Sequence, residues 1–138
     1  MKIYKTKAKK LAATNYEEAH RKARNYYDTL KHSKRTKKMP SVQSAFFNQK
    51  ILLDEFWKHL GQKNVQDRAR RLKYFICGIE LIKNSKCGPS SKENINKKTQ
   101  ILHRFMGSTS DNEIFYVQIR EDKKTGKKYL MSIYPDNE

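Results

Sequence analysis

The sequence predicts an α+β fold in which N-terminal helices pack on a small C-terminal antiparallel sheet of three or four strands. Apolar residues recur with helical spacing in the first part of the chain, and the period changes to two from about residue 99. A stretch rich in Gly, Pro, Ser and Asn, NSKCGPSSKENINKK, separates the two parts and is expected to be a surface loop. At 138 residues the chain fits one domain. We divide it into a basic helical extension at 1–40, a helical cover at 41–98 and a β-meander at 99–135.

The first helix is expected to begin near Asn15, because Thr14 and Glu17 have the spacing of a capping box. Its apolar stripe contains Tyr16, Ala19, Ala23, Tyr26, Tyr27 and Leu30. We expect it to end near Ser33, where the basic run KHSKRTKK begins a connection to Pro40. The first 38 residues hold 13 Lys and Arg against three Asp and Glu. A disordered basic arm is the alternative for this segment.

The middle of the chain predicts an extended segment followed by two helices. Residues 42–47 are apolar and bounded by turn formers, which favours a strand. The next stretch, KILLDEFWKHLGQ, has the helical period and ends at Gly61, a residue suited to a helix C-terminus. A second helix is predicted in VQDRARRLKYFICGIELIKNS, where Gly78 bends or divides it.

Three β-rich runs complete the chain and predict an antiparallel meander. They are QILHRFMG, EIFYVQIRE and KKYLMSIYP, joined by the turn sequences STSDN and DKKTGK. Alternation along the last two strands separates an apolar face from a polar one. The apolar face is expected to carry Phe115, Val117, Ile119, Tyr129, Met131 and Ile133. The other face is expected to carry Tyr116, Gln118, Arg120, Lys128, Leu130, Ser132 and Tyr134.

The charge of the chain indicates a polyanionic partner. Lys and Arg number 31 against 14 Asp and Glu, which gives a net charge of +17. This surplus is larger than solubility requires, and it favours nucleic acid as the partner, although an acidic protein or an acidic membrane surface would also select it. The chain shows neither a secretory signal nor an apolar run that could cross a bilayer, so we expect a cytoplasmic protein.

The expected polar sheet face holds groups that suit the cleavage of RNA without a metal. That reaction requires a proton acceptor, a proton donor and cations near the phosphate. His103 is the first candidate for acid or base, but strand parity also places it beside core residues, and both roles stay open. Arg104, Arg120, Lys127 and Lys128 are candidates for holding phosphate, although some of them are expected to be solvated only. Lys97 and Gln118 are further candidates for nucleic-acid contact, and Tyr116 and Tyr134 would stack on bases or pack against neighbouring side chains. Arg68, Arg70 and Arg71 would bind phosphate or form a solvated helix face.

Other chemistries have no sequence support. Cys77 and Cys87 lack partners for a zinc site or a disulfide framework. The chain contains no HExxH, P-loop, GxSxG or dinucleotide motif. We therefore expect neither a metal nor a cofactor.

Residues 38–135 resemble the phage-associated branch of the barnase/EndoU/colicin/RelE-like nuclease superfamily. The resemblance rests on KKMPSVQSAFF, LLDEFWKHL, RARRLKYFICGIELIKNS, ILHRF and EIFYVQIREDKKTGKKYLMSIYP. It implies a metal-independent ribonuclease that leaves a 2′,3′-cyclic phosphate. By position in the family, His103 would act with Lys97 or Lys98 and with Ser132.

The sequence thus predicts a toxin-like or mobile-element-associated endoribonuclease acting on tRNA or another structured RNA by attack of the 2′-hydroxyl. In this prediction His103 is the acid or base, Arg104 and Arg120 hold the phosphate, and Ser132 and Lys98 assist. An acidic immunity or antitoxin protein is a further expected partner. The alternatives are a nucleic-acid-binding protein without catalysis and an interaction module for an acidic protein.

Overall fold

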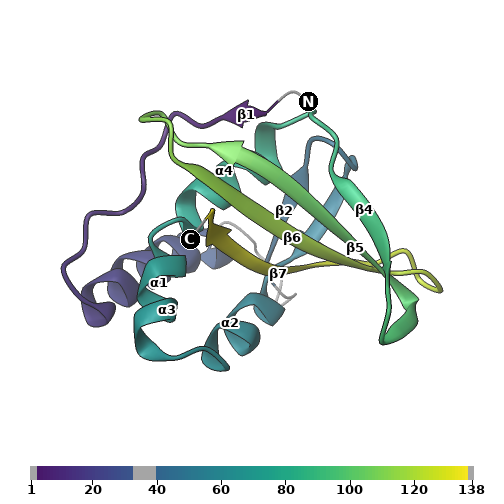
Figure 1. The fold of residues 1–138 in the computed structure, drawn as a ribbon, viewed down its shortest axis with the longest axis horizontal. Coiled ribbons are helices and arrows are strands. Elements are labelled where there is room, and N and C mark those ends of the chain that lie inside the picture. Colours follow the sequence, from purple (N-terminus) through teal and green to yellow (C-terminus); the bar gives the residue numbers. More distant parts are fainter. Residues whose placement is uncertain (1–2, 33–39, 137–138) are drawn as a thin grey trace.

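A computed structural model describes residues 3–32 and 40–136, and shows a curled sheet with helices packed against it (Figure 1). The element order in this part of the chain is β1 (Tyr4–Lys5), α1 (Tyr16–His32), β2 (Ser41–Ser44), β3 (Gln49–Leu52), α2 (Asp54–Gly61), α3 (Val65–Leu72), α4 (Phe75–Asn84), β4 (Ser90–Asn94), β5 (Lys97–Ser108), β6 (Ile114–Asp122) and β7 (Lys128–Pro135). Most of the predicted basic connection at 31–38 lies outside the described residues.

The sheet is larger than the sequence predicts, and it is mixed. Its seven strands run in the order β1-β5-β6-β7-β3-β2, and β4 also pairs with β5. The expected meander forms as β5, β6 and β7 in antiparallel pairing. Two pairs are parallel: β1 pairs with β5, and β3 pairs with β7. The prediction of a small antiparallel sheet with three or four strands is therefore wrong, although the α+β class holds.

The strands that the sequence does not predict are short or polar. β3 lies in the stretch predicted to begin a helix, and that helix starts later, at Asp54. β4 occupies part of the predicted surface loop and is mostly exposed, so it has no apolar alternation to reveal it. Its register is set by backbone pairing with β5, in which Ser91 lies opposite His103.

The N-terminal segment is part of the packed body. Ala19, Ala23 and Tyr27 of α1 are buried in the core. Glu80 of α4 fixes the chain before α1, because its carboxylate accepts hydrogen bonds from the Tyr4 hydroxyl and from two backbone N–H groups, with donor–acceptor distances of 2.8–3.0 Å. The described part of the predicted extension therefore belongs to the fold.

The cap of α1 differs from the predicted capping box by one residue. The Asn15 side chain accepts a hydrogen bond from the Glu18 N–H at 2.9 Å, and Glu18 accepts one from the Thr14 N–H at the same distance. Glu17 takes no part in either bond. The bonding resembles a capping box in which Asn15 is the cap. The Glu18 carboxylate accepts from the N–H of Thr14, the residue before the cap, instead of from the N–H of Asn15 itself.

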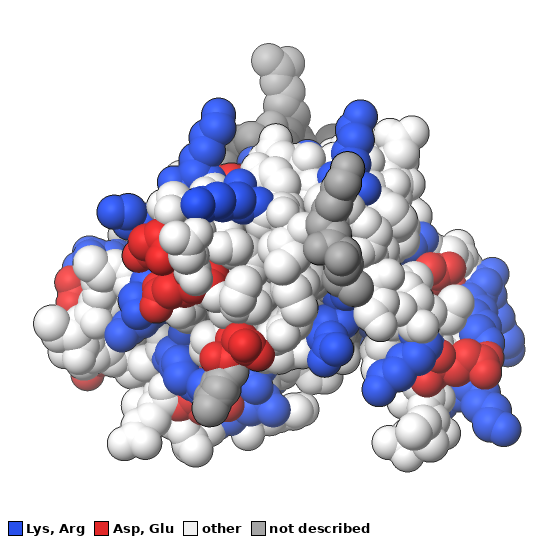
Figure 2. Space-filling view, turned by 45° about the horizontal axis from the view of Figure 1, so that its top comes forward, with Lys and Arg blue, Asp and Glu red and all other residues white. Residues whose placement is uncertain are grey.

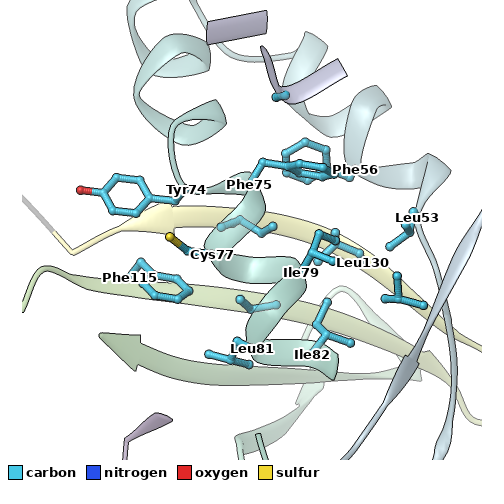
Figure 3. Close-up of a cluster of buried hydrophobic side chains, with 14 of the residues drawn as sticks. Leu53, Phe56, Tyr74, Phe75, Cys77, Ile79, Leu81, Ile82, Phe115 and Leu130 are labelled. Atoms are coloured by element: carbon cyan, nitrogen blue, oxygen red, sulfur yellow. The ribbon is translucent and has the colours of Figure 1, made fainter. Parts of the chain in front are cut away.

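Helix α4 lies across the inner face of the sheet and forms the centre of the core (Figure 3). Its residues Ile79, Leu81 and Ile82 are at most 2% exposed. A Cβ added to Gly78 would lie 2.4 Å from the Ile133 side chain, and one added to Gly107 would lie 2.6 Å from Leu81. Gly78 therefore sets the distance between helix and sheet, and the predicted division of the helix falls instead at residues 73–74, between α3 and α4.

The close approach of α4 predicts the effect of a single added methyl group. Gly78→Ala should lower the free energy of unfolding by about 1–3 kcal/mol, because the added methyl group overpacks against Ile133. The better helix propensity of Ala offsets up to about 1 kcal/mol of this loss. Urea denaturation measures the change. Gly61→Ala is the matched control, because a Cβ there meets nothing within 4 Å. Equal stability of the two variants would show that the contact at Gly78 is not limiting.

Candidate nucleic-acid interface

A shift in the pairing of β6 with β7 decides which residues share the outer face of the sheet. Gln118 lies opposite Ser132, whereas Ile119 lies opposite Leu130, so Met131 is an extra residue on β7. Before this bulge Tyr129 faces outward, and Lys128 and Leu130 face inward. The predicted orientation of these three residues was wrong, and so was that of Met131, which lines the outer face beside Ser132, because strict alternation along β7 does not account for the extra residue.

Two hollows lie along the outer face, and together we call them the basic groove. The larger, of about 570 Å³, is bounded by strands β5–β7 and by helices α2 and α3. The smaller, of about 200 Å³, shares Leu102 and Gln118 with it. Cationic and His side chains lining the two hollows are His59, Lys63, Arg71, Lys92, Lys97, Arg104 and Arg120.

Among the described residues, no carboxylate lines either hollow. Figure 2 shows Lys and Arg side chains in separate groups on the visible face, with groups of Asp and Glu among them. Two carboxylates do lie beside groove residues, where Asp67 is 3.1 Å from Arg71 and Asp122 is 3.2 Å from Arg120. Both ion pairs reduce the net positive charge beside the groove, and the hydrogen bond from Arg71 to Asp67 also positions that guanidinium group.

Arginine side chains stack on tyrosine rings along this face. The guanidinium carbon lies 5.0 Å from the ring centroid for Arg104 and Tyr116, and 5.2 Å for Arg71 and Tyr134. The Tyr116 and Tyr134 rings are themselves 5.5 Å apart. Burial, together with a hydrogen bond to Asp136, raises the pKa of Tyr116, so its hydroxyl stays protonated near neutral pH. The result is a row of planar groups on the outer face.

The structure brings about half of the predicted site residues together in or beside the groove. These are Arg104, Ser132, Lys97, Gln118, Arg120, Tyr116, Tyr134 and Arg71. Lys98 and Lys127 are exposed but do not line it. Arg70 is exposed and pairs with Asp67, and it also lies outside the groove. Arg68 donates hydrogen bonds to the carbonyl oxygens of Lys63 and Gly61, and so holds the turn between α2 and α3.

His103 and Lys128 lie on the inner face of the sheet, away from the groove. His103 is 7% exposed, and its ring nitrogens lie 2.6 Å from Ser91 Oγ and 2.8 Å from Glu121 Oε1. The Lys128 ammonium is 3.5 Å from the same Glu121 oxygen and donates a hydrogen bond to Gln49 at 2.7 Å. The structure therefore does not bring His103 to the phosphate-binding candidates Arg104 and Arg120.

The groove lining also includes His59, Gln62 and Lys63, which the sequence did not predict as site residues. They lie at and after the end of α2, in a segment where only the apolar stripe was considered. His59 also lines a small recess with Ser132, Lys63 and Arg71. A histidine on the polar side of a helix was a visible signal, but its position opposite the strands depends on the tertiary packing of α2 on β7.

Within residues 3–32 and 40–136, no three His, Cys, Asp or Glu side chains come together as ligands for a metal ion. No helix in this part of the chain is long and apolar enough to span a membrane. The chain matches no protein-family model, no curated protein and no solved structure. The resemblance to the nuclease superfamily therefore stays a prediction.

The inner-face contacts predict how stability depends on pH. Burial alone would raise the pKa of Glu121, but the hydrogen bond from His103 and the charge of Lys128 outweigh it, and the pKa falls below its ordinary value of 4.5. A carboxylate whose pKa is lowered by folding stabilises the folded state at a pH above the pKa of the unfolded chain. This contribution is lost as the pH falls toward and through the lower pKa of the folded state.

Urea midpoints measured from about pH 6 to about pH 3 should therefore fall less steeply for Glu121→Gln than for the wild type. Glu93→Gln serves as the control, because the Glu93 side chain is 61% exposed and lies on the edge strand β4. Parallel curves for the wild type and Glu121→Gln would contradict the prediction.

Proposed function

We propose that this protein binds single-stranded segments of RNA in the basic groove. The observation that carries the proposal is a groove whose described lining holds cationic side chains and no carboxylate, with arginines stacked on tyrosines beside it. Cations along a groove follow the phosphate backbone, and planar side chains stack on unpaired bases. A side chain can stack on a base only where the face of that base is exposed. Bases inside a duplex are stacked on each other, so we expect the groove to bind single-stranded RNA in preference to duplex RNA.

Removing groove charges should weaken RNA binding more than removing the same charge elsewhere. We expect the double variant Lys97→Ala/Arg104→Ala to bind a single-stranded RNA about tenfold or more weakly at low salt. The slope of log K against log salt should fall by about 0.7 for each phosphate that the variant no longer neutralises. Fluorescence anisotropy measures both quantities. The control is Lys83→Ala/Lys86→Ala, two exposed lysines at and after the end of α4 that do not line the groove.

A comparable loss of affinity in both double variants would mean that binding follows total charge, and the groove proposal would fail. Tighter binding of a duplex than of the single strand would contradict the stacking part of the proposal. The same titration with single-stranded DNA of matching sequence tests whether the 2′-hydroxyl contributes.

A second candidate function is RNA cleavage without a metal, and His59 is the observation that favours it. Its imidazole lines the groove beside Arg71, Lys63 and Ser132. Imidazole can accept the proton of a 2′-hydroxyl or donate one to the leaving oxygen, and the cations can stabilise the charged transition state. This arrangement retains the predicted chemistry but replaces His103 by His59 as the groove histidine.

Incubation of the protein with tRNA and total RNA in EDTA tests this candidate. We expect fragments that end in a 2′,3′-cyclic phosphate, and a loss of at least about 100-fold in rate for His59→Asn. The control is His20→Asn, because His20 lies on α1 between the Tyr16 and Trp57 rings. Intact RNA with the wild type would exclude cleavage of these RNAs. A loss of cleavage in His103→Asn but not in His59→Asn would assign the chemistry to the inner face.

A further inference from the structure

A chain of three side chains on the inner face forms a site that is separate from the groove. Ser91, His103 and Glu121 come from the adjacent strands β4, β5 and β6. The Ser91 Oγ lies 2.6 Å from His103 Nδ1, and His103 Nε2 lies 2.8 Å from Glu121 Oε1. Histidine thus connects a hydroxyl to a carboxylate, with one ring nitrogen for each.

The charge of Glu121 fixes the direction of its own hydrogen bond, and the direction of the Ser91 bond then follows for a neutral imidazole. An ionised carboxylate only accepts hydrogen bonds, so His103 Nε2 carries a hydrogen and donates it. In the neutral imidazole the other nitrogen is then an acceptor, and the Ser91 hydroxyl donates to Nδ1. This order of donors and acceptors is the one that a serine nucleophile, a histidine base and an orienting acid require, whichever ring nitrogen faces the serine.

The three groups differ in exposure in the way such a site needs. Ser91 is exposed on the edge strand, whereas His103 is 7% exposed. The Phe47 ring packs edge-on against the imidazole, with 4.9 Å between the ring centroids. Ser91 therefore lies at the surface, while its base is held in one orientation and shielded from water.

We propose that Ser91 is a nucleophile that attacks carboxylic esters, with His103 as the general base. Ser91 Oγ would bond to the carbonyl carbon while its proton passes to His103 Nδ1, and that proton would then leave with the alcohol as the ester C–O bond breaks. Water would attack the acyl-serine, give a proton to His103 and release the acid, and the proton would return to Ser91 Oγ. Glu121 is a positioning residue that orients the imidazole.

The surroundings favour an ester with an apolar acyl group. Phe46 is 41% exposed and lies 5.1 Å from Phe47, ring centroid to centroid. Gly88, on the connection that leads into β4, lies next to the Phe46 ring. An apolar surface thus adjoins the imidazole and offers an acyl chain a place to pack. The site shares no residue with the described lining of the groove, so it extends the protein's chemistry beyond RNA binding.

The test uses the full chain and a fluorophosphonate probe, which transfers its phosphonyl group to an activated serine and releases fluoride. Intact mass and peptide mapping should show one adduct, located at Ser91, and p-nitrophenyl butyrate should give a burst of nitrophenolate. Ser91→Ala should abolish both signals. The matched control is Ser90→Ala, because Ser90 neighbours Ser91 but faces the opposite side of the sheet, as alternation along a strand requires.

Glu121→Gln distinguishes an activated serine from a merely exposed one. A glutamine can donate to the imidazole and no longer fixes its tautomer, so labelling should slow by about tenfold or more and its pH profile should shift. Circular dichroism checks the fold, and if this variant does not fold, the comparison of Ser91→Ala with Ser90→Ala decides. Absence of an adduct at Ser91, or labelling at the same rate in folded Glu121→Gln, would overturn the proposal and leave RNA binding in the groove unaffected.

Discussion

The contact of α4 with the inner face of the sheet is the constraint on which the rest of the structure depends. Helix and strands approach so closely that Gly78 and Gly107 leave no room for a Cβ. Because α4 is buried against the inner face, the strand residues beneath it must be apolar. Polar residues are left to the outer face and to the part of the inner face that α4 does not cover. The basic groove and the His103 network occupy those two regions, so both candidate sites follow from the packing of one helix.

The bulge on β7 divides the polar residues between the two sites. It lets Leu130 and Ile133 both face the core although they are three residues apart, with the result that Ser132 and Tyr134 face the groove while Lys128 turns inward. On the inner face Lys128 forms contacts with Glu121 and Gln49 that compensate for its burial. A strand without the extra residue could not supply both an aromatic groove wall and an inner cation.

The sequence predicted the elements whose side chains carry a periodic signal and missed those defined by backbone pairing. The stripe of α1 and the alternation in β6 identified these elements, because one face of each is buried. β1 has only two residues and β4 is mostly exposed, and both are held in the sheet by backbone pairing with β5. Parallel pairing of β3 with β7 joins segments far apart in the chain, and no local pattern encodes it. About half of the predicted site residues meet in or beside the groove. The predicted alternation of inward and outward side chains was right along β6 but wrong at the start of β7.

The two histidines show why a residue's type does not determine its role. His103 lies in a strand beside an arginine in sequence, yet alternation directs its ring to the opposite face from Arg104, where Ser91 and Glu121 engage both nitrogens. His59 lies on helix α2, outside the strands, but packing of α2 against β7 places it in the groove with Arg71. A phosphate held in the groove can therefore reach His59 and not His103, and the chemistry open to His103 is set by the hydroxyl and the carboxylate that flank it.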